Sequence, residues 1–175
     1  MTDIVFGGLT ILLWLMLIAI ALLPALRNKI KHWLGKSNLA LLVIFVASCS
    51  AMLGSLWYSE ILNYQPCLLC WYQRIFMYPI ALLSLVALLI KDLQALLYFK
   101  VLAATGLVIS IFHLVQQRLP QTGVSCGAVG QAASCDTLYV NAFNLVTIPA
   151  MCATIFVTIL YVIYLYQTGA KKAVK

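Results

Sequence analysis

The chain has 175 residues, of which 65% are hydrophobic and only 9% charged, and its mean hydropathy is +1.05. Such a sequence has too few polar side chains to cover a water-soluble globule, and it is typical of an integral membrane protein. The formal net charge is +7, but the basic residues fall in short clusters between apolar runs. This distribution argues against a nucleic-acid-binding patch and is typical of membrane topology signals.

Five apolar stretches each approach the ~20 residues that a helix needs to cross ~30 Å of hydrocarbon. In chain order they are residues 4–26, 39–58, 71–90, 96–119 and 143–166. The fourth contains Lys100, whose side chain we expect to snorkel to the interface. The first has no basic residues before it, so we interpret it as a retained helix and not as a secretory signal. The sequence therefore predicts an all-α membrane protein.

The positions of the basic residues predict the orientation. Most Lys and Arg residues fall in the link 27–36, at Lys91 and Lys100, and in the tail 168–175. The positive-inside rule makes these segments cytoplasmic. The N-terminus and the segments 59–66 and 120–142 then lie outside.

Topology places four of the six cysteines on the outer side, namely Cys67, Cys70, Cys126 and Cys135. If the membrane is a bacterial plasma membrane, that side is where disulfides persist. Cys49 and Cys152 fall midway along apolar spans, where we expect free cysteines to pack as small hydrophobic residues.

Two interpretations of the outer cysteines remain open. They could form inert bridges or a four-thiolate zinc site, or they could be two redox pairs in series. Cys67 and Cys70 close too small a loop to stabilise much by chain entropy, whereas a thiol at a helix N-terminus is acidified toward the reactive thiolate. Pro66 suits such a helix start. Cys126 and Cys135 are nine residues apart, too far for the second close pair of a zinc ribbon, so the redox interpretation is favoured.

Arg74 follows Cys67 and Cys70 at i+7 and i+4, so a helix starting near Cys67 would place all three on one face. Arg74 and Arg118 are the two cations predicted outside. Each is either an interface anchor or a fixed charge that supports a Cys70 thiolate or a reduced acceptor such as a quinone.

The stretch FHLVQQR places His113, Gln116 and Gln117 on one face of the fourth span. An intramembrane histidine is often a hydrogen-bonded packing group, but His113 is also a candidate quinone partner or proton donor. Beside Cys135, Asp136 disfavours a thiolate. That points to Cys126 as the sulfur that stays bonded to a partner protein.

The stretch PCLLCWYQR resembles the signature of the DsbB family of bacterial membrane thiol oxidases, most closely its short BdbC-like branch. The order of elements agrees over about residues 39–167, ending in a last helix that carries VTIPA. The resemblance implies a four-helix bundle that reoxidises a DsbA-like thioredoxin-fold partner and passes electrons to ubiquinone or menaquinone. It also implies that Cys126 and Cys135 exchange with the partner.

By the same resemblance, Cys67 and Cys70 reoxidise the loop pair, with Cys70 next to the quinone and Arg74 supporting it. We add His113, Gln117 and Arg118 as candidate cofactor-binding residues and expect no metal. The implied setting is the bacterial cytoplasmic (inner) membrane, with the redox cysteines on the outer face and the C-terminus cytoplasmic.

The resemblance leaves residues 1–37 as an extra N-terminal transmembrane helix and basic link, 38–167 as the four-helix domain and 168–175 as a basic tail. The close spacing of the loop pair also departs from family members with a long second outer loop. Two alternatives stay open. One is an enzyme similar to vitamin K epoxide reductase, although the order of its cysteine pairs is opposite. The other is a non-catalytic membrane protein with structural disulfides or zinc.

Overall fold

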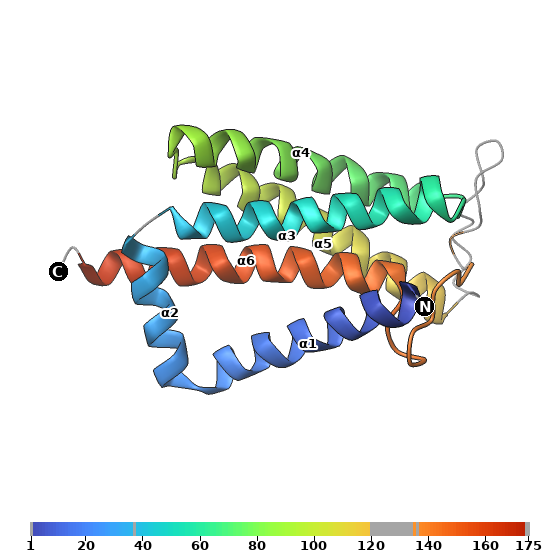
Figure 1. Ribbon diagram of the computed structural model, residues 1–175, viewed down its shortest axis with the longest axis horizontal. Helices are drawn as coiled ribbons and strands as arrows, with labels where there is room; N and C mark the ends of the chain where they lie inside the picture. Colours follow the sequence, from blue (N-terminus) through green and yellow to red (C-terminus); the bar gives the residue numbers. More distant parts are fainter. Residues whose placement is uncertain (1, 37, 120–134, 136, 174–175) are drawn as a thin grey trace.

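The computed structural model describes residues 2–36, 38–119, 135 and 137–173 (Figure 1). These residues form helices and connecting turns, which confirms the predicted all-α membrane class. In chain order the helices are α1 (Thr2–Leu22), α2 (Pro24–Lys36), α3 (Leu39–Leu56), the π-helical turn η1 (Trp57–Ile61), α4 (Leu68–Ile90), α5 (Ala95–Arg118) and α6 (Ile148–Ala173). Among the described residues, five helices are long and apolar enough to span a membrane, with η1 continuing α3.

Helices α3 to α6 run lengthwise beside one another and form a four-helix bundle (Figure 1). Its core contains side chains with no exposed surface, including Ile44, Phe99 and Phe156. Helices α5 and α6 approach closely because Gly106 lies against the Phe156 ring, where a Cβ atom would overlap the ring. The bundle is therefore held by close packing, which is the main source of helix association in lipid.

The N-terminal segment differs from the prediction in its boundary. The first span was expected over residues 4–26, but α1 ends at Leu22 and Pro24 opens the separate helix α2. Proline breaks a helix interior but fits the first position of a helix. Pro24 therefore explains both the end of α1 and the start of α2. The predicted basic link is thus a 13-residue helix, which connects α1 to the bundle near the C-terminal end of α6 (Figure 1).

The last span also begins later than expected. Residues 143–147 were assigned to the fifth apolar stretch, but α6 starts at Ile148. Phe143 and Asn144 both have φ of 56°, in the left-handed region, and Ala142 and Val146 form an isolated antiparallel bridge. This tight turn precedes the helix and brings the chain back over the end of the bundle.

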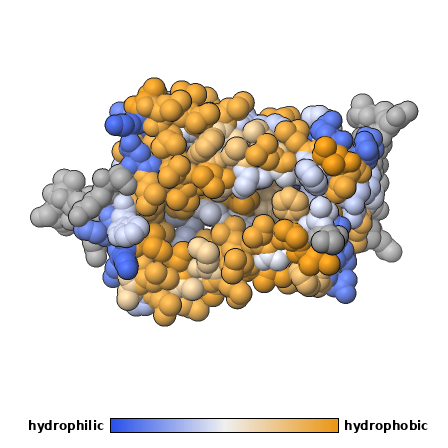
Figure 2. All heavy atoms as spheres, in the orientation of Figure 1, coloured by the Kyte–Doolittle hydropathy of each residue, from blue (hydrophilic) through white to orange (hydrophobic). Residues whose placement is uncertain are grey.

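The face seen in Figure 2 is mostly apolar across the middle of the molecule, and its hydrophilic residues gather toward the two ends. Many large apolar side chains of the spans are exposed, among them Leu12, Leu82 and Val108. Such a band is what lipid contact requires, so the chain is a multi-pass membrane protein.

Candidate redox site

Cys67 and Cys70 lie at the start of α4, where Cys67 is the N-cap residue. Its backbone is extended, with φ −73° and ψ 172°, and its sulfur accepts a hydrogen bond from the backbone N–H of Cys70. The two Sγ atoms are 3.0 Å apart and both cysteines are free thiols. The helix thus begins near Cys67, as predicted, but Cys67 itself is outside the helical turn.

Cys67 faces Cys135, which belongs to the segment before α6. Both side chains are only 3% exposed, and they pack in one small cluster with Leu69. The Sγ atoms of Cys67 and Cys135 and a ring nitrogen of His113 all lie within 4.8 Å of one another. Cys135 is disulfide-bonded, while Cys126 lies outside the described residues. A free thiol is therefore adjacent to a disulfide sulfur.

His113 is buried between the two cysteine segments. Its Nδ1 is 3.0 Å from Gln73 Nε2, and its Nε2 is 3.6 Å from Cys67 Sγ and 3.2 Å from the Cys135 carbonyl oxygen. An amide nitrogen can only donate, so Nδ1 accepts from Gln73 and the ring proton sits on Nε2. The Nε2–H is therefore directed at Cys67 and at the Cys135 carbonyl group.

These contacts act on the Cys67 sulfur. The pKa of the Cys67 thiol is lowered, chiefly by its hydrogen bond with the Cys70 side chain. His113 lowers the pKa further, as does the Cys70 backbone N–H, and burial opposes them. Hydrogen bonds to the charged form of a group favour that form. The thiol nearest to the Cys135 disulfide is thus the one that most readily becomes a thiolate.

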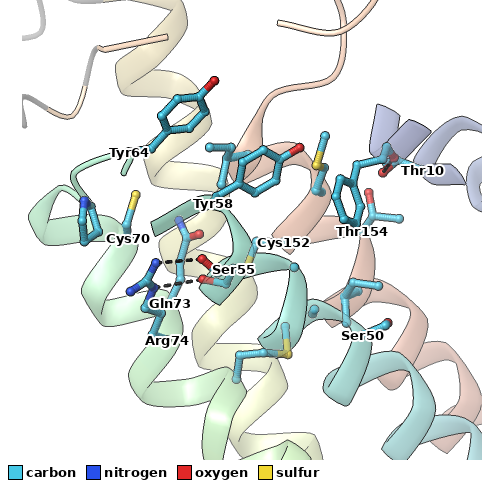
Figure 3. Close-up of a pocket in the computed structure, with 18 of the residues that line it drawn as sticks. Thr10, Ser50, Ser55, Tyr58, Tyr64, Cys70, Gln73, Arg74, Cys152 and Thr154 are labelled. Carbon is cyan, nitrogen blue, oxygen red and sulfur yellow. Dashed lines mark hydrogen bonds between the residues drawn. The ribbon is translucent and has the colours of Figure 1, made fainter. Parts of the chain in front are cut away.

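A cavity of about 280 Å³ opens on the other side of the cysteine pair. Its walls come from α1, α3, η1, α4 and α6, and Cys70, Gln73 and Arg74 form the α4 side (Figure 3). Cys67 does not line it. Cys67, Cys70 and Arg74 were expected on one face of the helix. Cys67 Sγ does lie beside Cys70 Sγ, and both residues line a second, small pocket, but only Cys70 and Arg74 reach the large cavity.

Arg74 is fixed at the cavity wall by α3. Its Nε donates to Ser55 Oγ at 2.9 Å, and its Nη2 donates to the Ser55 carbonyl oxygen at 3.1 Å (Figure 3). The guanidinium carbon is 5.2 Å from the centre of the Trp71 ring, within range of a cation–π contact. The hydroxyl group of Tyr78 donates to the same Ser55 Oγ at 3.4 Å. Arg74 thus presents a positioned cation beside Cys70.

The other candidate cofactor-binding residues lie elsewhere. His113 and Gln117 line a second, small pocket next to Cys67 and do not line the large cavity. Arg118 donates to the Leu145 carbonyl oxygen at 3.4 Å on the exposed end of α5. Of the four residues suggested by the sequence, only Arg74 is part of the large cavity.

Sequence reasoning missed several residues of the site. Ser55 anchors Arg74 although it is 19 residues away, and nothing in its apolar surroundings marks it. The bond of Gln73 to His113 spans 40 residues, and only the position of Gln73 beside the cysteine motif was a signal. Four residues of α1 also line the cavity, and no local pattern indicated that.

Known proteins resemble most of this chain. The family model described as "Disulfide bond formation protein DsbB" matches residues 37–166. A "Probable disulfide formation protein" of Oceanobacillus iheyensis is 38% identical over 138 residues, which is 78% of this chain and 95% of that protein. "Probable disulfide formation protein C 1" of Bacillus anthracis is 42% identical over 127 residues, 71% of this chain and 88% of that protein.

"Disulfide bond formation protein C" of Bacillus subtilis is 38% identical over 117 residues, which is 66% of this chain and 83% of that protein. No solved structure is significantly similar. Helices α1 and α2 both precede the region that the family model matches. The chain belongs to the DsbB family, as its cysteine motif predicted, and its role is in disulfide bond formation.

Proposed function

We propose that this protein takes electrons from the dithiol of a DsbA-like thioredoxin-fold partner and passes them to a quinone in the membrane. One observation carries the proposal. Cys67 Sγ lies within 4.8 Å of Cys135 Sγ and 3.0 Å from Cys70 Sγ, and Cys70 lines the large cavity. Three sulfurs thus lead from the segment before α6 to a cavity inside the apolar band.

The first step is exchange with the partner. A partner thiolate attacks the disulfide of Cys126 and Cys135, forms a mixed disulfide with Cys126 and releases Cys135 as a thiolate. The partner's second thiolate then attacks the partner sulfur that is bonded to Cys126 and releases Cys126 as a thiolate. The partner leaves as a disulfide, and the loop pair is left as a dithiol that holds two electrons.

The second step passes those electrons to the helix pair when Cys67 and Cys70 form a disulfide. The Cys135 thiolate attacks Cys67 Sγ and Cys70 leaves as a thiolate. Cys126 then attacks Cys135 Sγ, which re-forms the loop disulfide and releases Cys67. A low-pKa thiol is the better leaving group, so the contacts that lower the pKa of Cys67 favour this release.

The cavity fits a quinone ring in size and in chemistry. Its volume of about 280 Å³ is close to the lower end of the range of small-molecule sites, ~300–1,000 Å³. A guanidinium group has five N–H donors, and Arg74 donates one from Nε and one from Nη2 to Ser55. A bound ubiquinone or menaquinone supplies a two-electron, two-proton acceptor. Arg74 would hold a quinone oxygen next to Cys70.

We further propose that the site faces the outside of a bacterial cytoplasmic membrane. The start of α4 lies at the end of the bundle opposite to α2 and to the C-terminal end of α6 (Figure 1). Arg27, Lys29 and Lys31 belong to α2. The positive-inside rule then places α2 in the cytoplasm and both the N-terminus and the cysteines outside.

Covalent trapping tests the exchange with the partner. Membranes that hold the Cys135→Ser variant should form a stable disulfide-linked adduct, through Cys126, with a DsbA-like protein that keeps only its first active-site cysteine, activated as a mixed disulfide with 2-nitro-5-thiobenzoate. The Cys126 thiolate attacks the cysteine of the DsbA-like protein and displaces 2-nitro-5-thiobenzoate. The Cys126→Ser variant and a Cys49→Ser variant that keeps the loop pair are the matched controls. Absence of an adduct with both loop variants would contradict the exchange step. One zinc per purified chain, with unreactive thiols, would instead support the metal-binding alternative.

The contact between the two pairs has its own test. In a Cys70→Ser variant, Cys67 loses its resolving partner, so its thiolate should attack Cys135 and release Cys126. The resulting disulfide of Cys67 and Cys135 is detectable by mass spectrometry of peptides under non-reducing conditions. A variant in which Cys67 stays a free thiol would contradict the proposed path of the electrons.

A further inference from the structure

We propose that α1, which precedes the family domain, is the wall of the cavity that selects the quinone by its size. This inference rests on the proposed quinone site. Phe6, Leu9, Thr10 and Leu13 of α1 line the same cavity as Cys70 and Arg74 of α4. The family model begins at residue 37, so these four side chains are an addition to the four-helix core.

Helix α1 is held closely at its N-terminal end. Gly7 is buried, and a Cβ atom there would lie 2.5 Å from Ala142 Cβ. The Phe6 ring packs on the Tyr58 ring of η1 with centroids 5.5 Å apart. Contacts this close need the small residue at Gly7, so α1 has a defined position against the segment before α6 and the end of α3.

A second contact fixes α1 midway along its length. Trp14 Nε1 donates to Thr154 Oγ1 of α6 at 2.6 Å, and Thr154 is itself a cavity-lining residue. In lipid this hydrogen bond has no competition from water. The two contacts bracket Leu9, Thr10 and Leu13, so the α1 wall is supported on both sides of the cavity.

The two sides of the cavity differ in chemistry. Cys70, Gln73 and Arg74 make the α4 side polar and reactive. The α1 side is apolar, and the hydroxyl group of Thr10 does not change this because it donates to the Phe6 carbonyl oxygen at 2.8 Å. Helix α1 therefore meets the ring substituents or the isoprenoid tail of a quinone, while α4 meets its oxygens.

This division predicts a distinctive kinetic effect. A larger side chain on the α1 wall should weaken quinone binding while the sulfur chemistry at α4 proceeds unchanged. In kinetic terms, KM for the quinone rises and kcat is preserved. Exchange of thiols with the protein partner involves the other side of Cys67 and should not respond.

The test compares Thr10→Trp with Leu12→Trp in the full-length protein in lipid nanodiscs. Leu12 lies on the same helix but is 56% exposed on the lipid side and does not line the cavity. We expect KM for a short-chain ubiquinone to rise at least tenfold in Thr10→Trp and to stay at the wild-type value in Leu12→Trp. A photoreactive azidoquinone should label α1 of the wild-type protein within residues 6–13, and Thr10→Trp should reduce that labelling.

Other outcomes separate the possible failures. A wild-type KM in Thr10→Trp, with no label on α1, would overturn the inference and leave the quinone site intact. A wild-type protein that neither reduces nor binds any quinone would overturn the proposed function itself. If Thr10→Trp also loses exchange with the partner, the substitution has disturbed more than the cavity, and the Leu13→Ala variant tests the inference instead. By enlarging the cavity it should raise kcat/KM for a bulky quinone relative to a small one, and an unchanged ratio would overturn the inference.

Discussion

Replacement of His113 by Leu should raise the pKa of the Cys67 thiol. His113 Nε2 is 3.6 Å from Cys67 Sγ, and its N–H group stabilises the thiolate in a site where Cys67 is only 3% exposed. Leucine fills a similar volume but donates no hydrogen bond. The thiol should therefore need a higher pH to lose its proton.

The contacts of Cys67 bound the size of this change. A hydrogen bond to a charged group contributes roughly 1.5–3 kcal/mol, and about 1.4 kcal/mol corresponds to one pH unit. The N···S separation is long, so we expect an upward change of about one pH unit. The pKa should stay below that of an ordinary thiol, because the larger effect of the Cys70 side chain and the Cys70 backbone N–H remain.

Alkylation of the reduced protein as a function of pH measures the change. A small alkylating reagent is added between about pH 4 and 10, the range that covers a depressed and an ordinary thiol pKa, and the Cys67 peptide is quantified by mass spectrometry. Burial slows alkylation at every pH, so the midpoint of the profile still reports the pKa. The matched control is His32→Leu, because His32 is the only other histidine and is exposed on α2.

One result of the alkylation experiment would contradict this prediction. If His113→Leu and the wild-type protein share one midpoint, His113 does not stabilise the thiolate and only packs between the helices. A Gln73→Leu variant adds a second check. It removes the donor to Nδ1 at 3.0 Å but keeps the ring, so its midpoint should move in the same direction by less than that of His113→Leu.

Two further substitutions test the cavity and the bundle. Ser55→Ala removes the hydroxyl acceptor of Arg74 but leaves the backbone carbonyl group. We expect kcat/KM for the quinone to fall roughly tenfold, which corresponds to about 1.4 kcal/mol, while exchange with the partner is unchanged. An equal loss of both activities would mean that Arg74 has a structural role. Gly106→Ala should lower stability by about 1–3 kcal/mol through overlap with the Phe156 ring. Thermal unfolding in detergent should show the loss and its recovery in the double variant with Phe156→Leu, and no recovery would contradict the packing argument.

The sequence was sufficient to predict the features that depend on short windows of residues. A membrane span is defined by some twenty neighbouring apolar side chains, so the five spans were predicted with errors only at their ends. At the end of the first span, Pro24 indicates a helix break, but the apolar run continues to Leu26 and the span was therefore predicted too long. At another, Phe143 adopts a positive φ, which a bulky residue rarely does and which no sequence pattern indicates.

Long-range contacts explain what the sequence could not predict. The bond between Trp14 and Thr154 joins residues 140 apart, and the bond between Arg74 and Ser55 joins α4 to α3. Hydrophobic periodicity shows which segments are helices but not which faces meet. His113 illustrates the consequence: its depth on α5 suggested a quinone contact, but the packing of α5 against α4 directs it to Cys67.

The start of α4 lies between the two cysteines of the motif, so Cys67 and Cys70 have different backbone conformations. Cys67 has the extended backbone of a cap residue, and Cys70 lies in the first helical turn. Their sulfurs remain 3.0 Å apart, and both residues pack beside Cys135, but only Cys70 also lines the large cavity. In the proposed mechanism, the pair could therefore exchange with Cys135 through Cys67 and deliver electrons through Cys70 while the two sulfurs stay in contact.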